Sequence, residues 1–484
     1  MPSRWSKFGL FARLRERVKA ANSKHAHQSD GTAGTAPATS LDQRPCPQQP
    51  EPDVAITTDT CTATAVRDFV DIDVPADDEA IDMSQRAQPG SSHASPAQLT
   101  PAASRLETLP SELRLQVLAH ICDLDDLKSL ILASPVFYQQ YRLDRKHVLS
   151  RVLLSTLGSM LVDAHAVQRS ATLYSPPRSL VPDAMRDFLH SYISLRFAGP
   201  ELALEDCTLA DLLDMAVFHQ SVARPLSLKC AALFLQHLDP SLEVGSLSGA
   251  EQTRLLRALY RFQLYCNLFG QGPKPRRYRA VPMLDPTETL ALFFSSLNPW
   301  EVEEIDCIYT LIRNKYDAVF DAPQCEGRSP FNPNIMININ LGRPDRRLLR
   351  EGTALRGIQL FSQVLATHNH EELVKTIQRY QVPCYTYEHV LSWATQHSRR
   401  ALYASEGDLA EARREKLVFA GDTEDGPPLA WVIGWRGRYV NAYGPIIPAP
   451  LKAWGHVFWD RRRLIESKGK DEVLLTRDGQ GQAT

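Results

Sequence analysis

The sequence predicts a mainly α-helical protein with a disordered amino-terminal tail and a small mixed α/β part near the carboxyl end. Large apolar residues recur at helical spacing from Leu106 to about Phe320, while residues 1–103 contain few of them. Residues 427–448 instead carry short aromatic and aliphatic runs broken by glycine. We divide the chain into five parts, which are 1–103, 104–154, 155–320, 321–466 and 467–484.

Residues 1–103 are predicted to be disordered. From about residue 21 they are rich in Ala, Thr, Ser, Pro, Gln and Asp, and such a stretch cannot bury enough apolar surface to offset the entropy of ordering. The first twenty residues differ, because basic side chains and an apolar face from Phe8 to Val18 predict a short amphipathic helix. Organelle targeting and membrane-surface binding stay open for it, beside a solvated tail.

Between 104 and 154, the sequence reads as three consecutive short amphipathic helices. Glu112 suits the first turn of the first helix, Asp125 can cap the second, and Ser134 caps a third that is expected to run from Pro135 to Leu154. Three helices of this length hold too little core to stand alone, so their apolar faces need a cover. The rest of this chain could supply it, and so could a partner protein.

The body over 155–320 is expected to consist of helices in an irregular order, without a repeat of fixed period. Its clearest element begins with Asn298 as the capping residue, Pro299 at the first helical position and Glu301 three residues after the cap. An apolar face then continues to Phe320. This segment is predicted to be an amphipathic helix.

The part from 321 to 466 has a mixed pattern. A strand is predicted over 335–339, helices over 355–393 and 451–465, and a hairpin within 427–448, where Gly434 and Gly437 separate apolar runs. The aromatic residues of this last segment are of the types that dominate interface hot spots, so contact with a partner stays open beside core packing. The residues from 467 onward are expected to form a loose tail.

Charge and cysteine usage favour an intracellular protein, cytoplasmic or nuclear, whose partners are proteins. The 54 Lys and Arg residues nearly balance the 56 Asp and Glu residues, so no global field attracts nucleic acid or an anionic membrane. The nine cysteines are scattered without a C-x-x-C pair, which fits a reducing compartment. No apolar run approaches the roughly 18 to 20 residues of a spanning helix, so no stable membrane insertion is expected.

No catalytic, cofactor or metal site is predicted. The chain lacks a G-x-x-x-x-G-K-[ST] loop and an H-E-x-x-H pair, and residues 245–249 carry Leu247 where a nucleophile elbow needs serine. His368, His370 and Glu371 have the spacing of a polar helix start more than that of a metal site. The basic run 274–279 is interpreted as a solvated loop, and the alternative is a nuclear import signal or a nucleic-acid patch.

The combined runs L-P-x-E-L, V-L-x-x-I, D-L-x-x-L and A-S-x-x-F between 109 and 137 resemble the F-box, especially that of fungal proteins. The resemblance implies a substrate adaptor that binds a Skp adaptor and, through it, a cullin, while its body holds an unknown client protein. Such a subunit brings the client near the conjugating enzyme for ubiquitination and does not itself make or break bonds. The implied partner-binding residues are Leu109, Pro110, Glu112, Leu113, Val117, Leu118, Leu127, Leu130, Ser134 and Phe137.

The chain also departs from common boxes. It has no Trp near the end of the segment, and it carries Ser134 where many boxes have Cys. Two other classes remain open. One is a helical scaffold outside any ligase, whose box-like helices belong to its own core, and the other is a helical enzyme without recognisable motifs.

Overall fold

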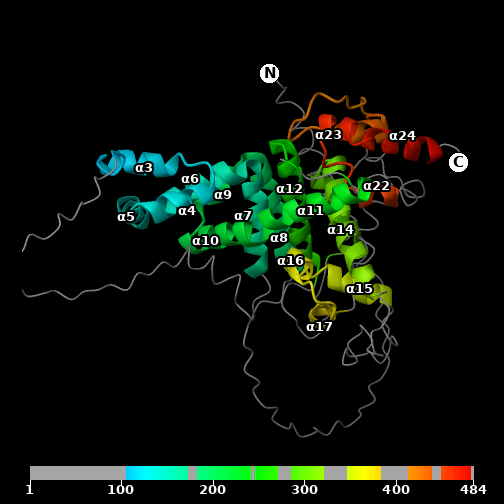
Figure 1. Ribbon diagram of the computed structural model, residues 1–484, viewed down its shortest axis with the longest axis horizontal. Coiled ribbons are helices and arrows are strands. Elements are labelled where there is room, and N and C mark those ends of the chain that lie inside the picture. Colours follow the sequence, from blue (N-terminus) through cyan, green and yellow to red (C-terminus); the bar gives the residue numbers. More distant parts are fainter. Residues whose placement is uncertain are drawn as a thin grey trace, which may run out of the picture. The chain divides into compact units, whose positions relative to one another are not determined.

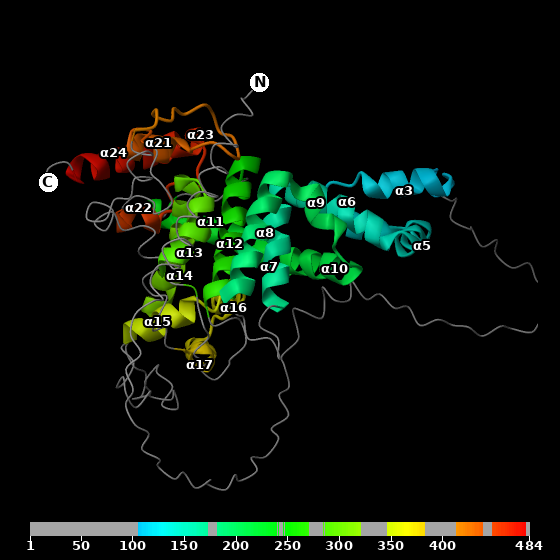
Figure 2. The ribbon, with the colours of Figure 1, turned by 180° about the vertical axis from the view of Figure 1, so that it is seen from behind.

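The computed structural model describes residues 105–172, 182–239, 241, 245, 247–270, 284, 286–320, 346–382, 413–438 and 448–480, all of which fall within one unit of the chain (Figures 1 and 2). Several predictions concern residues outside these ranges. They are the tail over 1–103, the strand over 335–339 and the basic run 274–279.

The described part of the chain is mainly helical, as predicted, and contains no strand. Its α-helices are α3 (Ser111–Ala119), α4 (Leu124–Ala133), α5 (Pro135–Leu143), α6 (Arg145–Leu157), α7 (Leu161–Thr172), α8 (Pro182–Ala198), α9 (Pro200–Glu205), α10 (Leu209–Phe218), α11 (Arg224–Leu238), α12 (Gly249–Phe269), α13 (Pro286–Leu292), α14 (Pro299–Phe320), α15 (Arg346–Ala354), α16 (Ile358–Ala366), α17 (His370–Tyr380), α21 (Leu429–Trp435), α22 (Ala449–Ala453), α23 (Arg461–Glu466) and α24 (Gly469–Gln480). Short 3₁₀ turns occur at η1 (Gly158–Met160) and η3 (Phe294–Ser296), and η2 (His219–Ala223) is a π-helix.

Local capping explains where several helices begin. Helix α14 starts at Pro299 as predicted, and the backbone N–H of Asn298 donates to Glu301 Oε2 over 2.7 Å. Ser134 caps α5 by accepting from the backbone N–H of Phe137, also as predicted. Helix α4 begins one residue before Asp125, because the side chain of Asp123 is the one that accepts from the Asp125 N–H over 2.7 Å.

The single third helix predicted from Pro135 to Leu154 is wrong. The chain forms two helices there, α5 and α6, separated by Asp144, whose backbone leaves the helical region at φ −114° and ψ 25°. The Asp144 carboxylate accepts from Gln140 Nε2 over 2.7 Å. Aspartate has a low propensity for helix interiors and favours helix ends, which fits the break at this position.

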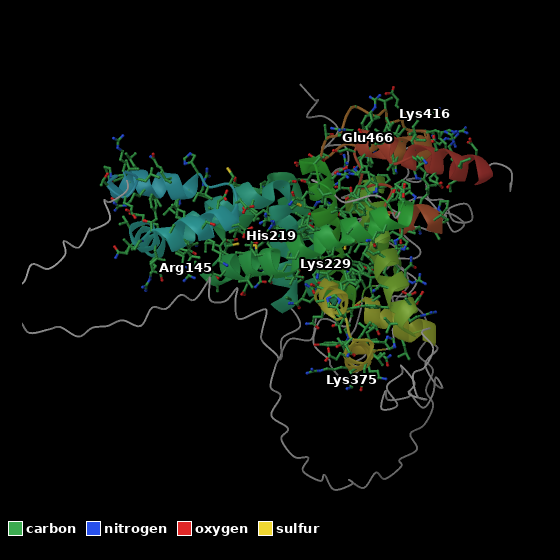
Figure 3. All side chains as sticks on the ribbon, viewed as in Figure 1. Arg145, His219, Lys229, Lys375, Lys416 and Glu466 are labelled. Atoms are coloured by element: carbon green, nitrogen blue, oxygen red, sulfur yellow. The ribbon has the colours of Figure 1, made fainter. Side chains whose placement is uncertain are left out.

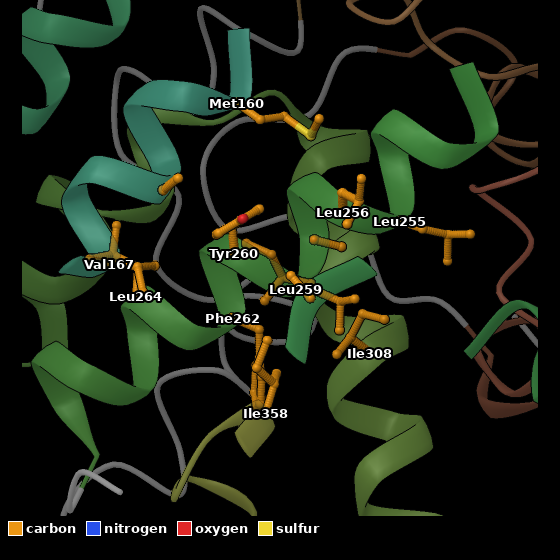
Figure 4. Packing of buried hydrophobic residues seen from close by; sticks show 14 of the residues in the cluster. Met160, Val167, Leu255, Leu256, Leu259, Tyr260, Phe262, Leu264, Ile308 and Ile358 are labelled. Carbon is orange, nitrogen blue, oxygen red and sulfur yellow. The ribbon is translucent and has the colours of Figure 1, made fainter. Parts of the chain in front are cut away.

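Helix α12 lies at the centre of the body and is buried on all sides from Thr253 to Phe269. Helices α7 and α14 pack along it, and Figure 4 shows its side chains Leu259 and Phe262 among residues of neighbouring elements. A helix that is buried all round is typical of the interior of a larger domain. A single apolar core extends through the described residues from Leu118 in α3 to Val473 in α24.

The π-helix η2 joins α10 directly to α11. Pro225, the second residue of α11, has no backbone N–H, and its ring would collide with a carbonyl one turn earlier in a regular α-helix. The wider π turn just before it relieves this conflict. The three elements therefore continue without a loop from Leu209 to Leu238.

The hairpin and the mixed α/β character predicted for the carboxyl-terminal part are wrong for the described residues. Residues Leu429–Trp435 form helix α21, and the side chain of Trp431 is fully buried. The helix ends at Arg436 in the left-handed conformation, followed by Gly437, where an added Cβ would lie 2.0 Å from Leu417 O. The tail expected to be loose from 467 contains helix α24.

Candidate partner-binding site

Helices α3 to α6 form the structural counterpart of the predicted box, and α6 continues into the body (Figure 1). Helix α6 packs on α3, α4 and α5, and also on α7, α9 and α10. Its apolar residues Val148, Val152 and Leu153 are fully buried. Helix α6 is therefore part of the packing of both the predicted box and the body.

Four of the ten predicted partner-binding residues lie inside this protein's own core. Leu118, Leu127 and Phe137 are buried against neighbouring helices. Ser134 is also buried, and its hydroxyl donates to Glu107 Oε1 over 2.5 Å. These four side chains stabilise the box itself and are not available to a partner in this arrangement.

The other six predicted residues lie at or near the surface. Pro110, Glu112 and Leu113 are exposed, and Leu113 keeps 44% of its surface accessible. Leu109, Val117 and Leu130 are half-buried. The structure thus divides the predicted set into an inner and an outer group.

Three further apolar side chains of this region are exposed and were not among the predicted site residues. They are Leu106, Leu132 and Leu143, with 51%, 60% and 82% of their surfaces accessible. We call these three residues together with Pro110 and Leu113 the outer apolar set. The signal in the sequence is a large apolar residue at a position that the packing leaves uncovered, which can be recognised only once the buried residues are known.

The turn before α3 is held in place by hydrogen bonds. The Arg114 guanidinium donates to Leu109 O over 2.7 Å and to Glu107 O over 3.3 Å, and the Leu109 N–H donates to Leu106 O over 3.4 Å. These bonds give the carbonyl groups of the turn partners and place Leu106 next to the start of α3. Figure 3 shows the side chains of this region on helices α3 to α6.

Among the described residues, the others singled out in the sequence do not form a second site. Trp431 belongs to the core, where it meets Trp300 edge to face with ring centroids 5.4 Å apart. Glu371 pairs with Lys375 over 2.9 Å at the start of α17, and within the described ranges no group of three metal-ligating side chains comes together. Trp431, one of the aromatic residues of the predicted hot spot, thus serves core packing.

Buried thiols and imidazoles are kept in their neutral forms. Burial raises the pKa of Cys207 to about 11 and lowers the pKa of His219 to about 4. Burial also lowers the pKa of His456 to about 3, and His456 Nε2 lies 3.2 Å from Glu303, whose pKa burial raises. A thiol with a raised pKa is a poor nucleophile, so Cys207 is unsuited to covalent catalysis.

No protein-family model, curated protein or solved structure matches the chain. Across the described helices, none is both long enough and apolar enough to cross a membrane.

Proposed function

We propose that the chain is an F-box substrate adaptor that binds a Skp adaptor, and through it a cullin, and presents a client protein for ubiquitination. The observation that carries the proposal is the outer apolar set. Leu113 is exposed on the first helix of the box-like motif, beside Pro110 and close in sequence to the exposed Leu106. Partner interfaces bury apolar side chains at their centre, so the exposure of Leu113 and Leu106 supports this proposal.

The inner residues support the same proposal in a different way. Leu118, Leu127 and Phe137 pack inward, so the box helices are already ordered and the exposed residues are held on a rigid support. A partner that binds such a surface loses less entropy than one that must order it. In this role the chain contributes proximity of client and conjugating enzyme, within the cytoplasm or the nucleus.

A helical scaffold outside any ligase is the second candidate. The observation that favours it is the burial of Leu118, Leu127, Ser134 and Phe137 within the chain itself. If the box helices exist only to form the first layer of the body, adaptor binding is absent. The two candidates therefore differ in one measurable property.

The experiment is capture of purified fungal Skp adaptor by the full chain. We expect Leu113→Glu and Leu106→Glu to abolish capture, because a desolvated and unpaired carboxylate in an interface costs about 3 to 5 kcal/mol. Leu475→Glu is the matched control, since Leu475 is 69% exposed in α24, far from the box in sequence. Equal capture by Leu113→Glu and wild type, with both chains equally stable, would exclude docking through this face.

A further inference from the structure

Two contacts, a hydrogen bond and an ion pair, join the start of helix α4 to the body. The Thr156 hydroxyl, in α6, donates to Cys122 O over 3.2 Å just before α4 begins. Arg224, the first residue of α11, donates through Nη1 to Asp125 Oδ2 and lies 3.5 Å from Asp123 Oδ1. Arg224 and Asp125 are 99 positions apart in the sequence, so this contact joins the box to the middle of the body.

The position of Arg224 follows from the π-helix. Helix α11 begins directly after η2, and its first side chain reaches the amino-terminal turn of α4. That turn carries three carboxylates, from the capping Asp123 and from Asp125 and Asp126. A guanidinium beside them reduces their mutual repulsion and can bind two carboxylates with defined geometry.

This contact contributes little to the stability of the fold. The side chains of Arg224, Asp123 and Asp125 are 32%, 34% and 58% exposed, and ion pairs of this kind are worth at most about 1 kcal/mol. The apolar packing of α6 holds the box to the body, but apolar attraction is non-directional. The ion pair at the start of α4 is directional and adds a preferred orientation to the apolar packing.

We propose that Arg224 is a positioning residue that sets the angle between helices α3 to α5 and the body through Asp123 and Asp125. A consequence for ubiquitin transfer rests on the proposed adaptor function, in which the box binds the ligase and the body binds the client. The angle itself is a property of this chain and can be measured without any partner.

The first test measures the distance between spin labels on full-length protein by pulsed electron resonance. The labels are carried by non-canonical residues at Gln116 in α3 and Gln236 in α11, both exposed. Wild type is expected to give one narrow distance peak and Arg224→Met a broader one, because losing a contact worth at most about 1 kcal/mol lets other orientations be populated. Arg224→Lys keeps the charge and loses the planar guanidinium, so its peak is expected to have a width between those of wild type and Arg224→Met. An unchanged peak in Arg224→Met would overturn the proposal.

A double-mutant comparison separates this contact from a general loss of order. Asp125→Asn is expected to broaden the peak as Arg224→Met does, and the two changes together are expected to add nothing further. High salt should broaden the wild-type peak and leave Arg224→Met unaffected, because partly exposed charges are screened. Lys229→Glu, on the next turn of α11, is the charge control and should leave the peak narrow. Full additivity of the two changes would contradict the assignment.

The second test asks whether the angle matters for transfer. In a reaction reconstituted with Skp adaptor, cullin, RING subunit and conjugating enzyme, the lysines of the chain itself serve as acceptors and are mapped by mass spectrometry. We expect Arg224→Met to capture the adaptor like wild type while ubiquitin moves to other lysines. An identical lysine pattern would overturn the role in transfer. If wild type fails to capture the adaptor, the adaptor function fails, and the distance measurement still decides the role of Arg224.

Discussion

Arg257 in α12 and Glu304 in α14 form a two-point ion pair in the centre of the body, with Nε–Oε2 and Nη2–Oε1 distances of 2.9 and 2.6 Å. Both side chains are almost completely buried. Arg257 also donates to Glu424 O over 2.8 Å, which fastens the segment before α21 to the central helix. Paired donors and acceptors of this kind compensate charges that could not remain buried alone.

We therefore expect Arg257→Met to destabilise the fold by about 3 to 5 kcal/mol, because it leaves Glu304 buried without its partner. Arg257→Met combined with Glu304→Met should recover much of this loss, since it removes both charges. Urea unfolding followed by circular dichroism measures the differences. Arg462→Met is the control, because Arg462 pairs with Glu466 at the surface with 86% of its side chain exposed. A loss below about 1 kcal/mol for Arg257→Met would contradict the expectation.

The buried His219 predicts how stability depends on pH. Burial lowers its pKa to about 4, and its Nδ1 lies 3.1 Å from the hydroxyl of Tyr260. Below the ordinary histidine pKa near 6.5, the unfolded chain binds a proton that the folded chain does not, so stability is lost as pH falls towards 4. Relative to His219→Phe, wild type should lose up to about 1.4 kcal/mol per pH unit between pH 6 and 5. A pH-independent difference between the two would contradict the neutral state of His219.

Two leucines of α4 test the division of the box into inner and outer residues. Leu127 is fully buried, whereas Leu132 on the same helix is 60% exposed. Leu127→Ala is expected to cost about 2 to 5 kcal/mol, and Leu132→Ala less than about 0.5 kcal/mol. Thermal unfolding of the two variants measures the contrast. Equal losses would show that the arrangement of α4 differs from the one described here.

The shared helix α6 predicts where the chain can be shortened. A chain that begins at Gly158 loses α6 and exposes the apolar surfaces of α7 and α10 that it covers, so aggregation is expected. A chain that begins at Arg105 keeps α3 to α6 together, with their apolar faces covered, and should stay monomeric in size-exclusion chromatography. Equal solubility of both chains would show that α6 is not part of the body.

Helix starts could be predicted from the sequence because they depend on neighbouring residues. Asn298 with Glu301, and Ser134 with Pro135, act within one turn and were assigned correctly. The segment around Trp431 was assigned wrongly, because a short apolar run with aromatic residues fits a buried helix as well as a strand. The length and the residue propensities of such a run do not distinguish a helix from a strand when tertiary packing determines which of them forms.

The inner and outer residues of the box could not be separated from the sequence. Leu113 and Leu118 both lie in one apolar helix pattern, and only the packing of α6 against α3 shows which of them is covered. That packing depends on residues that are distant in the sequence and, through α10, on the body. Local periodicity carries no information about such contacts. Adaptor binding itself stays a prediction that the capture experiment decides.

The π-helix between α10 and α11 makes the length of this segment critical. The π turn holds one residue more than an α turn, so deleting one residue within His219–Ala223 would leave an α turn and bring the ring of Pro225 against a carbonyl one turn earlier. Inserting one residue would instead rotate the whole of α11 by about 100°, so that Leu226, Cys230 and Phe234 would leave the core and Arg224 would point away from α4. A surface loop absorbs a lost residue at small cost. Here we expect single substitutions to be tolerated more readily than any insertion or deletion.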